Sequence, residues 1–419
     1  MKILIVGNGG REHAFAWKLN QNTKVTQIFV AKGNPGCELL SKVKCVNLAT
    51  PEELLEFAKS NAIDLTIVGS EELLVHGIVD QFKAANLAIF GPDKQAAQLE
   101  GSKSFAKGFM NKYGVKTAQH QSFTDYAAAL KYLAHVSYPV VIKASGLAAG
   151  KGVIIAANYE EADTALAAML LEQVFGESGS EVVIEEFLVG VEASILAFTD
   201  SNVILPLISA KDHKKIGEGE TGLNTGGMGV IAPNPYVTEQ VNQDFINDIL
   251  NPTLDGIKAE KMDFAGVVFF GVMITANGVY CLEYNMRMGD PETQAVLPLM
   301  KNDLLEAIEA CLDKKLANIS FDWYTGSTCC VVVASGGYPE HFKKGLKITG
   351  IEQFKHSNCQ LFSAGVAKHN NDFVTAGGRV LNVVAHGDDL DSARELAYKV
   401  IYEVNFENGY YRTDIGALK

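Results

Sequence analysis

The sequence contains no run of about 20 apolar residues, the length that a helix needs to cross a bilayer. It also lacks an excess of basic residues, because 36 Lys and Arg against 49 Asp and Glu give a formal net charge of −13. Basic surfaces bind nucleic acids and anionic membranes, so this charge argues against both as partners. It does not argue against phosphorylated small molecules, which are held locally by glycine loops and a few Lys and Arg side chains.

Cysteine is scarce and is not arranged for a disulfide or zinc framework. The seven cysteines are odd in number and form no CxxC pair. Four of them lie in largely apolar, strand-like segments: Cys45, Cys281, Cys329 and Cys330. We therefore expect reduced thiols in a cytoplasmic protein. The N-terminus begins as a strand rather than as a cleavable leader, which fits that expectation.

The first hundred residues alternate short apolar strands with helices, which predicts a parallel sheet covered by helices on both faces. Strands are expected at 2–7, 26–31, 44–48, 64–69 and 87–91, and the clearest helices at 52–60 and 73–85. Ligands of such sheets bind beyond the carboxyl ends of the strands. Those ends carry the segments GNGGREH, KGNPG and GSEE.

After residue 101 the pattern changes. Strands are expected at 138–143, 153–157, 181–188 and 193–198, and helices at 102–112, 159–171 and about 238–259. The last ninety residues are predicted to form a separate α+β unit with one helix at 390–405. We therefore expect three domains: an N-terminal α/β domain (1–101), a central domain (102–324) with a flap-bearing part at about 115–190, and a C-terminal α+β domain (325–419).

The segment 279–294, VYCLEYNMRMGDPETQ, carries the strongest indication of chemistry. An Asn-Gly pair just before it separates two apolar runs and predicts a β-hairpin. Residues two apart on a strand share a face, so Glu283, Asn285 and Arg287 are predicted to point the same way. A carboxylate and an amide oxygen suit Mg²⁺, and a guanidinium suits phosphate or carboxylate. The alternative is a solvated polar face at the end of a surface hairpin.

The loop 7–12, GNGGRE, begins like a dinucleotide-binding fingerprint but has Glu12 in place of the third glycine. The next strand also ends without the acidic residue that would hold a ribose hydroxyl. Backbone N–H groups at this turn are predicted to hold a single phosphate. A purely structural turn and, more remotely, an NAD(P) site are the alternatives.

The loop 145–152, SGLAAGKG, resembles a P-loop that is one residue short and that connects two strands. Gly152 stands where a P-loop has Ser or Thr. This pattern favours a mobile glycine flap over nucleotide phosphates, with a flexible surface hairpin as the alternative. A second loop, 224–229 (NTGGMG), offers backbone donors with little side-chain bulk, as expected where backbone approaches an anion.

Charged residues flank these loops. Glu185 and Glu186 end an apolar strand, and one of them is predicted to accept a hydrogen bond from a ligand such as an adenine amino group. Glu192 is placed to bind ribose hydroxyls. Each is equally interpretable as an exposed charge at a strand end. His213 is a candidate general base, although a solvated loop histidine is the commoner case and the one expected here.

Taken in order, a lysine-ended strand, a glycine flap, an EEFL strand and a Glu-x-Asn-x-Arg strand resemble the ATP-grasp fold of carboxylate–amine ligases. Within it, NGGREH, EGSK, GLAAGKGV, NTGGMG and RMGDPETQ resemble the glycinamide ribonucleotide synthetase family over essentially the whole chain. The resemblance implies an N-terminal parallel α/β domain, an ATP-grasp domain and a small C-terminal α+β domain. It implies an ADP-forming enzyme of de novo purine biosynthesis that joins glycine to 5-phosphoribosylamine through a glycyl phosphate, with ATP and Mg²⁺ or Mn²⁺.

The resemblance also implies roles for particular residues. ATP would be contacted by Lys103, Lys143, Gly146, Gly150, Lys151, Gly152, Glu186, Leu188 and Glu192. The metal ligands would be Glu283 and Asn285, and the catalytic residues Arg287, Lys143 and Asp290. The ribose phosphate of phosphoribosylamine would be held by Asn8, Gly9, Gly10, Arg11 and Glu71. Glycine and the phosphoryl group in transfer would be bordered by Asn224, Thr225, Gly226, Gly227, Arg287, Gly289 and Asp290.

Three residues depart from the family pattern: Ser145, Ser70 and Met288 stand where members commonly have Asp, Pro and Phe. The first change removes a charge beside the flap, and the others look like packing changes. The strand before the Asn-Gly turn lacks the acidic metal ligand that many ATP-grasp enzymes carry.

The alternative functions are another ATP-grasp ligase for a different acid and amine or, remotely, a dinucleotide-dependent dehydrogenase. We expect a monomer whose partners are ATP, glycine and 5-phosphoribosylamine.

Overall fold

The computed structural model describes residues 1–148 and 152–418. The N-terminal region is a five-stranded parallel sheet in the order β3-β2-β1-β4-β5, as predicted. Its strands are β1 (Lys2–Gly7), β2 (Gln27–Lys32), β3 (Val43–Val46), β4 (Leu65–Val68) and β5 (Ile89–Phe90). Its helices are α1 (Gly10–Asn20), α2 (Pro51–Ser60), α3 (Glu71–Val75), α4 (Ile78–Ala84) and α5 (Lys94–Gly101), with a 3-10 turn η1 (Pro35–Leu39).

The helix predicted at 73–85 is two helices, α3 and α4. Gly77, between them, has a backbone φ of +85°, in the left-handed region that glycine adopts without a steric penalty. The apolar periodicity of the segment continues through this break, so periodicity alone did not reveal it.

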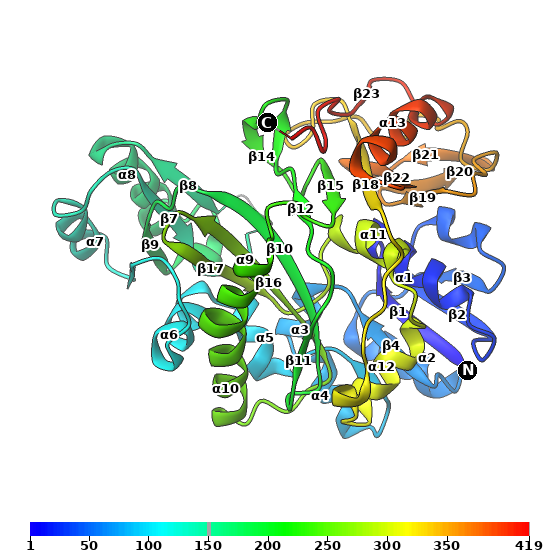
Figure 1. Cartoon of the computed structure of the whole chain (residues 1–419), viewed down its shortest axis with the longest axis horizontal. Coiled ribbons are helices and arrows are strands. Elements are labelled where there is room, and N and C mark those ends of the chain that lie inside the picture. The colour runs from blue at the N-terminus through cyan, green and yellow to red at the C-terminus, as the bar shows by residue number, and fades with distance from the viewer. Residues whose placement is uncertain (149–151, 419) are drawn as a thin grey trace.

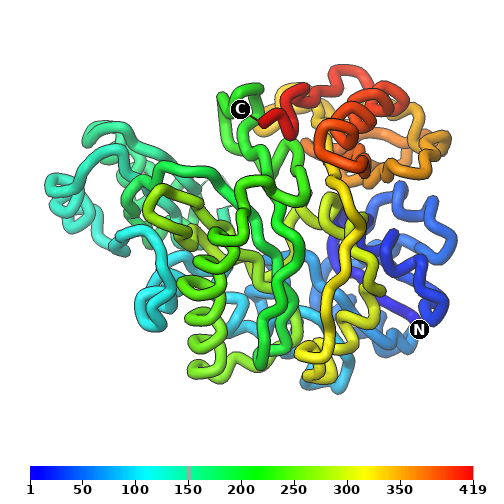
Figure 2. The backbone as a smooth tube through the Cα atoms, in the orientation of Figure 1, coloured from blue at the N-terminus to red at the C-terminus, as the bar shows by residue number. Residues whose placement is uncertain are grey.

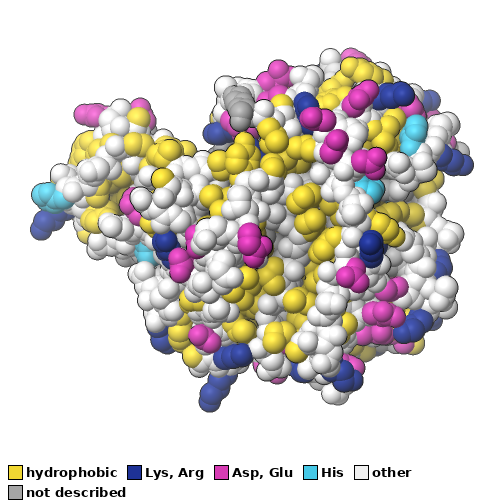
Figure 3. Space-filling view, in the orientation of Figure 1, with side chains coloured by type: hydrophobic (Ala, Val, Ile, Leu, Met, Phe, Trp, Pro, Cys, Tyr) yellow, Lys and Arg dark blue, Asp and Glu magenta, His cyan; other side chains and the backbone are white. Residues whose placement is uncertain are grey.

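A second region projects from the body of the molecule as a lobe (Figure 1), and the space-filling view shows the surface hollowed beside it (Figure 3). It contains an antiparallel sheet in the order β6-β9-β7-β8. Its elements are α6 (Lys103–Tyr113), β6 (His120–Phe123), α7 (Tyr126–Leu133), β7 (Val140–Ala144), β8 (Val153–Ala156), α8 (Tyr159–Leu166), a π-turn η2 (Ala167–Leu171), a 3-10 turn η3 (Gly176–Gly179) and β9 (Val182–Glu186).

A third, antiparallel sheet has the order β11-β10-β16-β17. The Asn-Gly hairpin is confirmed, with Gly278 at φ +107° starting the second strand. The helix predicted at 238–259 contains a π-turn at its centre. The elements are β10 (Val191–Thr199), β11 (Ile204–Pro206), α9 (Glu239–Phe245), η4 (Ile246–Leu250), α10 (Asn251–Ala259), β16 (Gly266–Thr275), β17 (Gly278–Asn285), α11 (Glu292–Val296), η5 (Leu297–Leu299), α12 (Leu304–Leu312) and η6 (Leu316–Asn318).

The C-terminal sheet is not built from the last ninety residues alone. Its order is β12-β15-β18-β22-β19, with β23 also paired to β18, so two strands come from the middle of the chain. Lys347 and Thr349 form isolated bridges with Val374 and Asn405. The elements are β12 (Lys211–Asp212), β13 (Lys215–Gly217), β14 (Thr221–Asn224), β15 (Gly229–Ala232), β18 (Ser327–Ser335), β19 (Cys359–Ser363), β20 (Val366–His369), β21 (Asp372–Thr375), β22 (Arg379–Gly387), α13 (Leu390–Val400), η7 (Ile401–Glu403) and β23 (Gly409–Tyr410).

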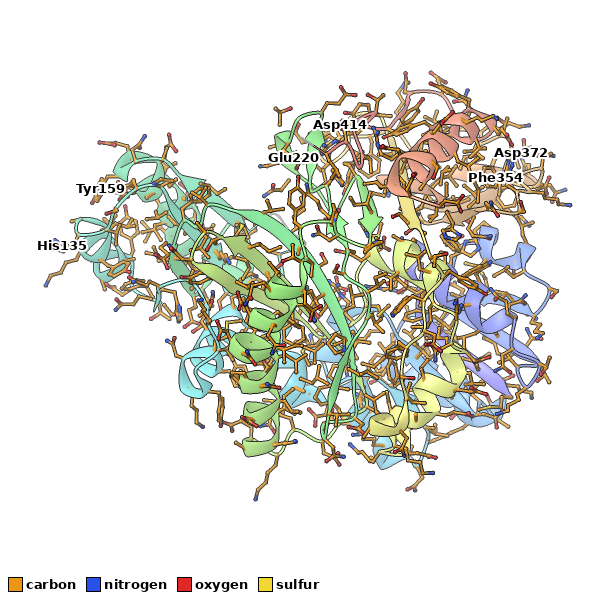
Figure 4. The ribbon with its side chains drawn as sticks, in the orientation of Figure 1. His135, Tyr159, Glu220, Phe354, Asp372 and Asp414 are labelled. Atoms are coloured by element: carbon orange, nitrogen blue, oxygen red, sulfur yellow. The ribbon has the colours of Figure 1, made fainter. Side chains whose placement is uncertain are left out.

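The segment 212–229 carries a small hairpin, β13–β14, that lies against the end of the chain (Figure 2). The buried guanidinium of Arg412 donates to Glu220 at 2.7 Å and to Asp414 at 2.8 Å. Both carboxylates lie at the same corner of the molecule (Figure 4). One apolar core joins the N-terminal sheet, β10, α11, α12 and the C-terminal sheet. None of the described helices is long and apolar enough to cross a membrane.

Candidate active site

The end of β17 and the turn after it bring together the side chains predicted to share a face. Nη2 of Arg287 donates to Oδ1 of Asn285 at 3.2 Å. The same nitrogen lies 3.0 Å from Oε1 of Glu100, and Nε lies 3.6 Å from Oε2 of Glu71. Nε is buried and has no hydrogen-bond partner among the residues that the structure describes. The guanidinium is thus fixed by Asn285, Glu100 and Glu71, and its Nε is a buried donor without a hydrogen bond.

Cations surround the carboxylate of Glu283. Burial by itself raises the pKa of this carboxyl, but the charges of Lys214, Lys143 and Lys103 outweigh burial, and the pKa lies below its usual value. In the described part of the chain, no three His, Cys, Asp or Glu side chains are grouped to hold a metal ion. A divalent ion here would use Glu283, Asn285 and phosphate oxygens. This small set of hard oxygen ligands fits Mg²⁺, which usually binds one or two protein oxygens.

The buried carboxylate of the EEFL strand is Glu185. Its Oε1 lies 2.9 Å from Nζ of Lys143, and its Oε2 lies 3.1 Å from Nζ of Lys107. Burial raises the pKa of Glu185, but the two lysines outweigh it, so the pKa is lowered. Nζ of Lys143 also lies 3.5 Å from the carbonyl of Leu282 in β17. This buried triad fixes Lys143 between the lobe and the hairpin, and the sequence did not point to Lys107.

Glu186, the next residue, is exposed. Its Oε1 accepts a hydrogen bond from the backbone N–H of Gln119 at 2.8 Å. Strand β9 ends at Glu186, so Leu188 lies in the irregular segment that follows and is partly buried. Glu192, at the start of β10, forms an ion pair with Lys214 at 2.7 Å. The three residues predicted for adenine and ribose therefore lie along one connection from β9 to β10.

Lys103 is the first residue of α6, and its Nζ donates to the carbonyl of Gly146 at 3.2 Å. Burial lowers the pKa of this lysine. The hydroxyl of Ser145 accepts a hydrogen bond from the backbone N–H of Ser104 at 3.1 Å. Ser145, where the family commonly has Asp, thus satisfies a donor at the N-terminus of α6.

The flap itself is only partly described. Gly150 and Lys151, both predicted to contact ATP, lie outside the described residues. Gly152 directly precedes strand β8, and its carbonyl accepts a hydrogen bond from the N–H of Ala144 at 2.8 Å.

The glycine turn before α1 is occupied by carboxylates of the protein. The N–H of Gly9 donates to Glu12 at 2.7 Å, and the N–H of Arg11 donates to Oδ2 of Asp290 at 3.3 Å. A Cβ on Gly9 would lie only 2.6 Å from that same oxygen. Two of the donors predicted to hold a phosphate are thus engaged, which leaves the exposed side chain of Asn8 available in this segment.

Two guanidinium groups converge beside this turn. Nη1 of Arg11 donates to the carbonyl of Met288 at 3.1 Å, and Nη1 of Arg287 donates to the same oxygen at 3.2 Å. Burial would raise the pKa of the nearby Glu71 carboxyl, but the two arginines lower it. This side of the site can therefore accommodate an anionic group.

Arg379, on β22, connects the two loops predicted to border the amino-acid site. Its Nη1 donates to the carbonyls of Gly226 at 2.5 Å and Asp290 at 2.7 Å. Its Nη2 lies 3.3 Å from Oδ1 of Asp290. Sequence reasoning missed this arginine because no motif or spacing relates it to the 224–229 loop.

His213 is neither solvated nor available as a base. The N–H of Gly416 donates to its Nε2 at 3.2 Å, so Nδ1 carries the proton and donates to the carbonyl of Gly229 at 3.1 Å. The ring is buried. The prediction of a solvated loop histidine is wrong, because the C-terminal segment at Gly416 contacts the ring.

The burial of His213 predicts that the stability of the fold depends on pH in the acid range. Burial lowers the pKa of His213 to about 4 from 6.5. The unfolded chain binds a proton below about pH 6.5 and the folded protein does not until about pH 4, so the fold loses stability as the pH falls through that window. Between about pH 6.5 and pH 5, His213 should cost the parent chain about 2 kcal/mol of unfolding free energy. The His213→Gln variant should not show this loss.

Denaturant titrations across this pH range measure the effect. His135→Gln is the matched control, because His135 is exposed on the projecting lobe (Figure 4). A His213→Gln variant that keeps the full pH slope of the parent chain would contradict this assignment.

Comparison with known proteins decides the family. Models of phosphoribosylglycinamide synthetase match in series: the N domain over residues 1–100, the ATP-grasp (A) domain over 101–293 and the C domain over 328–418. The chain belongs to the phosphoribosylglycinamide synthetase family. The three-part architecture and the family predicted from the sequence are confirmed.

Relatives of this family match over their full length. The phosphoribosylamine–glycine ligase of Fusobacterium nucleatum is 61% identical over 420 residues, covering 100% of this chain and 99% of that protein. That of Clostridium acetobutylicum is 54% identical over 419 residues, covering 100% of both. The crystal structure of the Thermotoga maritima ligase superposes with a TM-score of 0.87 at 31% identity, covering 99% of this chain and 100% of that one.

A Campylobacter jejuni biotin carboxylase also superposes, with a TM-score of 0.77 at 15% identity over 99% of this chain and 94% of that one, which shows a shared fold alone. The dehydrogenase alternative finds no support. The relatives named above are ligases, and here the glycine turn before α1 is engaged by Glu12 and Asp290.

Proposed function

We propose that the side chains gathered where α6, β7 and β17 meet form the active site of an ADP-forming ligase. The enzyme joins glycine to 5-phosphoribosylamine with ATP and gives glycinamide ribonucleotide, ADP and phosphate in de novo purine biosynthesis. One observation carries the placement of the site. Lys143 and Lys103 from the lobe and Arg287 from the hairpin converge around the Glu283 carboxylate. Such a cluster suits a metal-bound triphosphate and an acceptor carboxylate.

The chemistry explains what the site must provide. Glycine's carboxylate is a poor acyl donor because its leaving group would be oxide. Transfer of the γ-phosphoryl group of ATP to a carboxylate oxygen gives glycyl phosphate and ADP. The amine of phosphoribosylamine then attacks the carbonyl carbon, the C–O bond to phosphate breaks, and the amine loses a proton. No protein nucleophile is required, so the protein contributes positioning and neutralisation of charge.

Roles for the residues follow from their positions. Lys143 and Lys103 bind the triphosphate, and their burial strengthens each contact with an anion. Arg287 stabilises the phosphoryl group in transfer through the positive charge of its guanidinium. Glu283 and Asn285 hold Mg²⁺ or Mn²⁺, which when bound supplies positive charge to the phosphate oxygens.

The nucleotide base and ribose are assigned to the connection from β9 to β10. Glu186 and the backbone of Leu188 contact adenine, and Glu192 contacts the ribose. Gly146, Gly150, Lys151 and Gly152 belong to the flap that excludes water from the acyl phosphate.

The remaining substrates are assigned to the glycine turn before α1 and to the two loops that Arg379 connects. Arg11, Asn8, Gly9, Gly10 and Glu71 border the ribose phosphate. Asn224–Gly227, Gly289 and Asp290 border glycine, supported by the contacts of Arg379 with Gly226 and Asp290. We also infer a cytoplasmic monomer that binds neither nucleic acid nor membrane; the formal charge of −13 supports the last two points.

A co-substrate omission assay tests this function. ADP release with ATP and Mg²⁺ is expected only when glycine and freshly generated phosphoribosylamine are both present. Release that persists without glycine, or that a different acid supports equally well, would favour another ligase of the same fold.

A further inference from the structure

Lys107 is a buried lysine of helix α6 with no assigned role. Its side chain is 3% exposed, and its Nζ lies 3.1 Å from Oε2 of Glu185. Nζ also donates to Oγ1 of Thr117 at 2.7 Å, and that hydroxyl donates to the carbonyl of Cys281 at 2.6 Å. These contacts are all with the protein. A buried ion pair is expensive to desolvate, and an apolar side chain of similar volume often fills such a space at no loss of stability. Packing alone therefore does not account for a lysine at this position.

The carboxylate that pairs with Lys107 also contacts a lysine of the proposed active site. Oε1 of Glu185 lies 2.9 Å from Nζ of Lys143, without the geometry of a hydrogen bond. The contact of the same Nζ with the carbonyl of Leu282 is long, at 3.5 Å. Leu282 directly precedes Glu283, the proposed metal ligand. Lys143 thus lies between the buried pair and the site, and the protein engages its donors only loosely.

The charges of these three side chains do not cancel, because two ammonium groups face one carboxylate. Burial raises the pKa of Glu185, but the two lysines outweigh it, so the carboxylate is ionised. Burial lowers the pKa of Lys143, but the charges of Glu185 and Glu283 outweigh it. Burial also lowers the pKa of Lys107, and the ionised carboxylate at 3.1 Å favours its charged form. Without Lys107, the charge of Glu185 would offset that of Lys143.

On the basis of the proposed function, in which Lys143 binds the triphosphate, we propose that Lys107 is a positioning residue for Lys143. It pairs with Glu185, so that this carboxylate holds Lys143 in place without cancelling its charge. A triphosphate is then attracted by an uncompensated cation in a poorly solvated site. Adenosine, which has no phosphate, gains nothing from this charge. Lys107 therefore contributes to the preference of the site for phosphorylated nucleotides.

Lys107→Met tests this role, because it removes the charge and keeps much of the side-chain volume. The Kd for ATP with Mg²⁺ should rise roughly tenfold, the effect of one unit charge at a distance of about 10 Å in a protein. The Kd for adenosine should change by less than about twofold, because adenosine is uncharged. Isothermal titration calorimetry in the absence of glycine and phosphoribosylamine measures both constants.

A double variant separates the charge of Lys107 from any structural role. Glu185→Gln in the Lys107→Met background removes the carboxylate as well, so the charge of Lys143 is again uncompensated. The Kd for ATP should then return to within about threefold of the parent value, whereas a purely structural role predicts that the second loss adds to the first. Lys112→Met is the control, because Lys112 lies on the same helix and forms a more exposed pair with Glu260 at 2.5 Å.

Three results would overturn the role of Lys107 and leave the ligase function intact: equal losses for ATP and adenosine, an unchanged Kd for ATP, or no recovery in the double variant. If Lys107→Met is insoluble, Lys107→Gln provides the same comparison, since its amide can still donate to Thr117. A parent chain that neither binds ATP nor releases ADP with both co-substrates would overturn the proposed function itself.

Discussion

Replacing Arg287 with alanine is expected to lower kcat by roughly 10²–10³-fold, the scale of removing one preorganised donor to a developing anion. The guanidinium is fixed in advance by Asn285, by Glu100 and by the carbonyl of Met288. Its Nε is buried, lies 3.6 Å from Oε2 of Glu71 and makes no hydrogen bond among the described residues. Steady-state ADP release at saturating substrate concentrations measures the change.

A comparison of variants separates catalysis from folding. Arg287→Lys keeps the charge near Glu100 but loses the planar fork, so its kcat should lie between those of the parent and the alanine variant. Lys347→Ala is the matched control, because Lys347 forms an exposed pair with Asp372 at 2.8 Å on the C-terminal domain (Figure 4). A fall in kcat of less than about threefold for Arg287→Ala would remove Arg287 from the catalytic residues.

Replacing Glu185 with glutamine is expected to cost about 3–5 kcal/mol of unfolding free energy, the usual result of removing one partner from a buried ion pair. The Glu185 side chain is 2% exposed and pairs with Lys107 at 3.1 Å and Lys143 at 2.9 Å. The substitution leaves two buried ammonium groups with no carboxylate between them. Denaturant titration monitored by a probe in the lobe reports this change.

Glu186→Gln provides the control at the next position. Glu186 is exposed, and a glutamine oxygen can still accept from the N–H of Gln119. Its cost should stay below about 1 kcal/mol. Equal losses for the two variants would show that the triad does not stabilise the lobe.

The sequence predicted those parts of the fold that local patterns encode. Continuous apolar runs predicted the parallel N-terminal strands, and an Asn-Gly pair predicted the hairpin that carries Glu283 and Asn285. Pairing between distant segments was not predictable from such patterns. The addition of β12 and β15 to the C-terminal sheet is one example, and the contact of Arg379 with Gly226 is another.

Glu185 and Glu186 show that sequence patterns also fail to predict contacts between distant segments within the site. The EEFL motif located Glu185 and Glu186 on one strand, but only burial distinguishes them. Glu185 faces Lys107, which lies 78 positions earlier in the chain, and Glu186 faces solvent. Strand alternation places the two on opposite faces but does not say which face is buried.

The N-terminal glycines show how a motif can have a packing origin. A Cβ on Gly10 would lie 2.4 Å from Nε2 of Gln294 and 2.6 Å from Nδ2 of Asn382. These neighbours come from the central and C-terminal regions. The glycines of this turn are therefore required where three parts of the chain meet, in addition to any role in binding phosphate.

The proposed function depends most on a divalent ion held by Glu283 and Asn285 against the nucleotide phosphates, and a Mg²⁺ titration of Glu283→Gln tests it most directly. The half-saturating Mg²⁺ concentration for ADP release should rise at least roughly tenfold, because even residues behind a metal ligand are worth about 10–100-fold in affinity. The KM for glycine should change far less. A Mg²⁺ titration that superposes on that of the parent chain would show that the metal binds elsewhere.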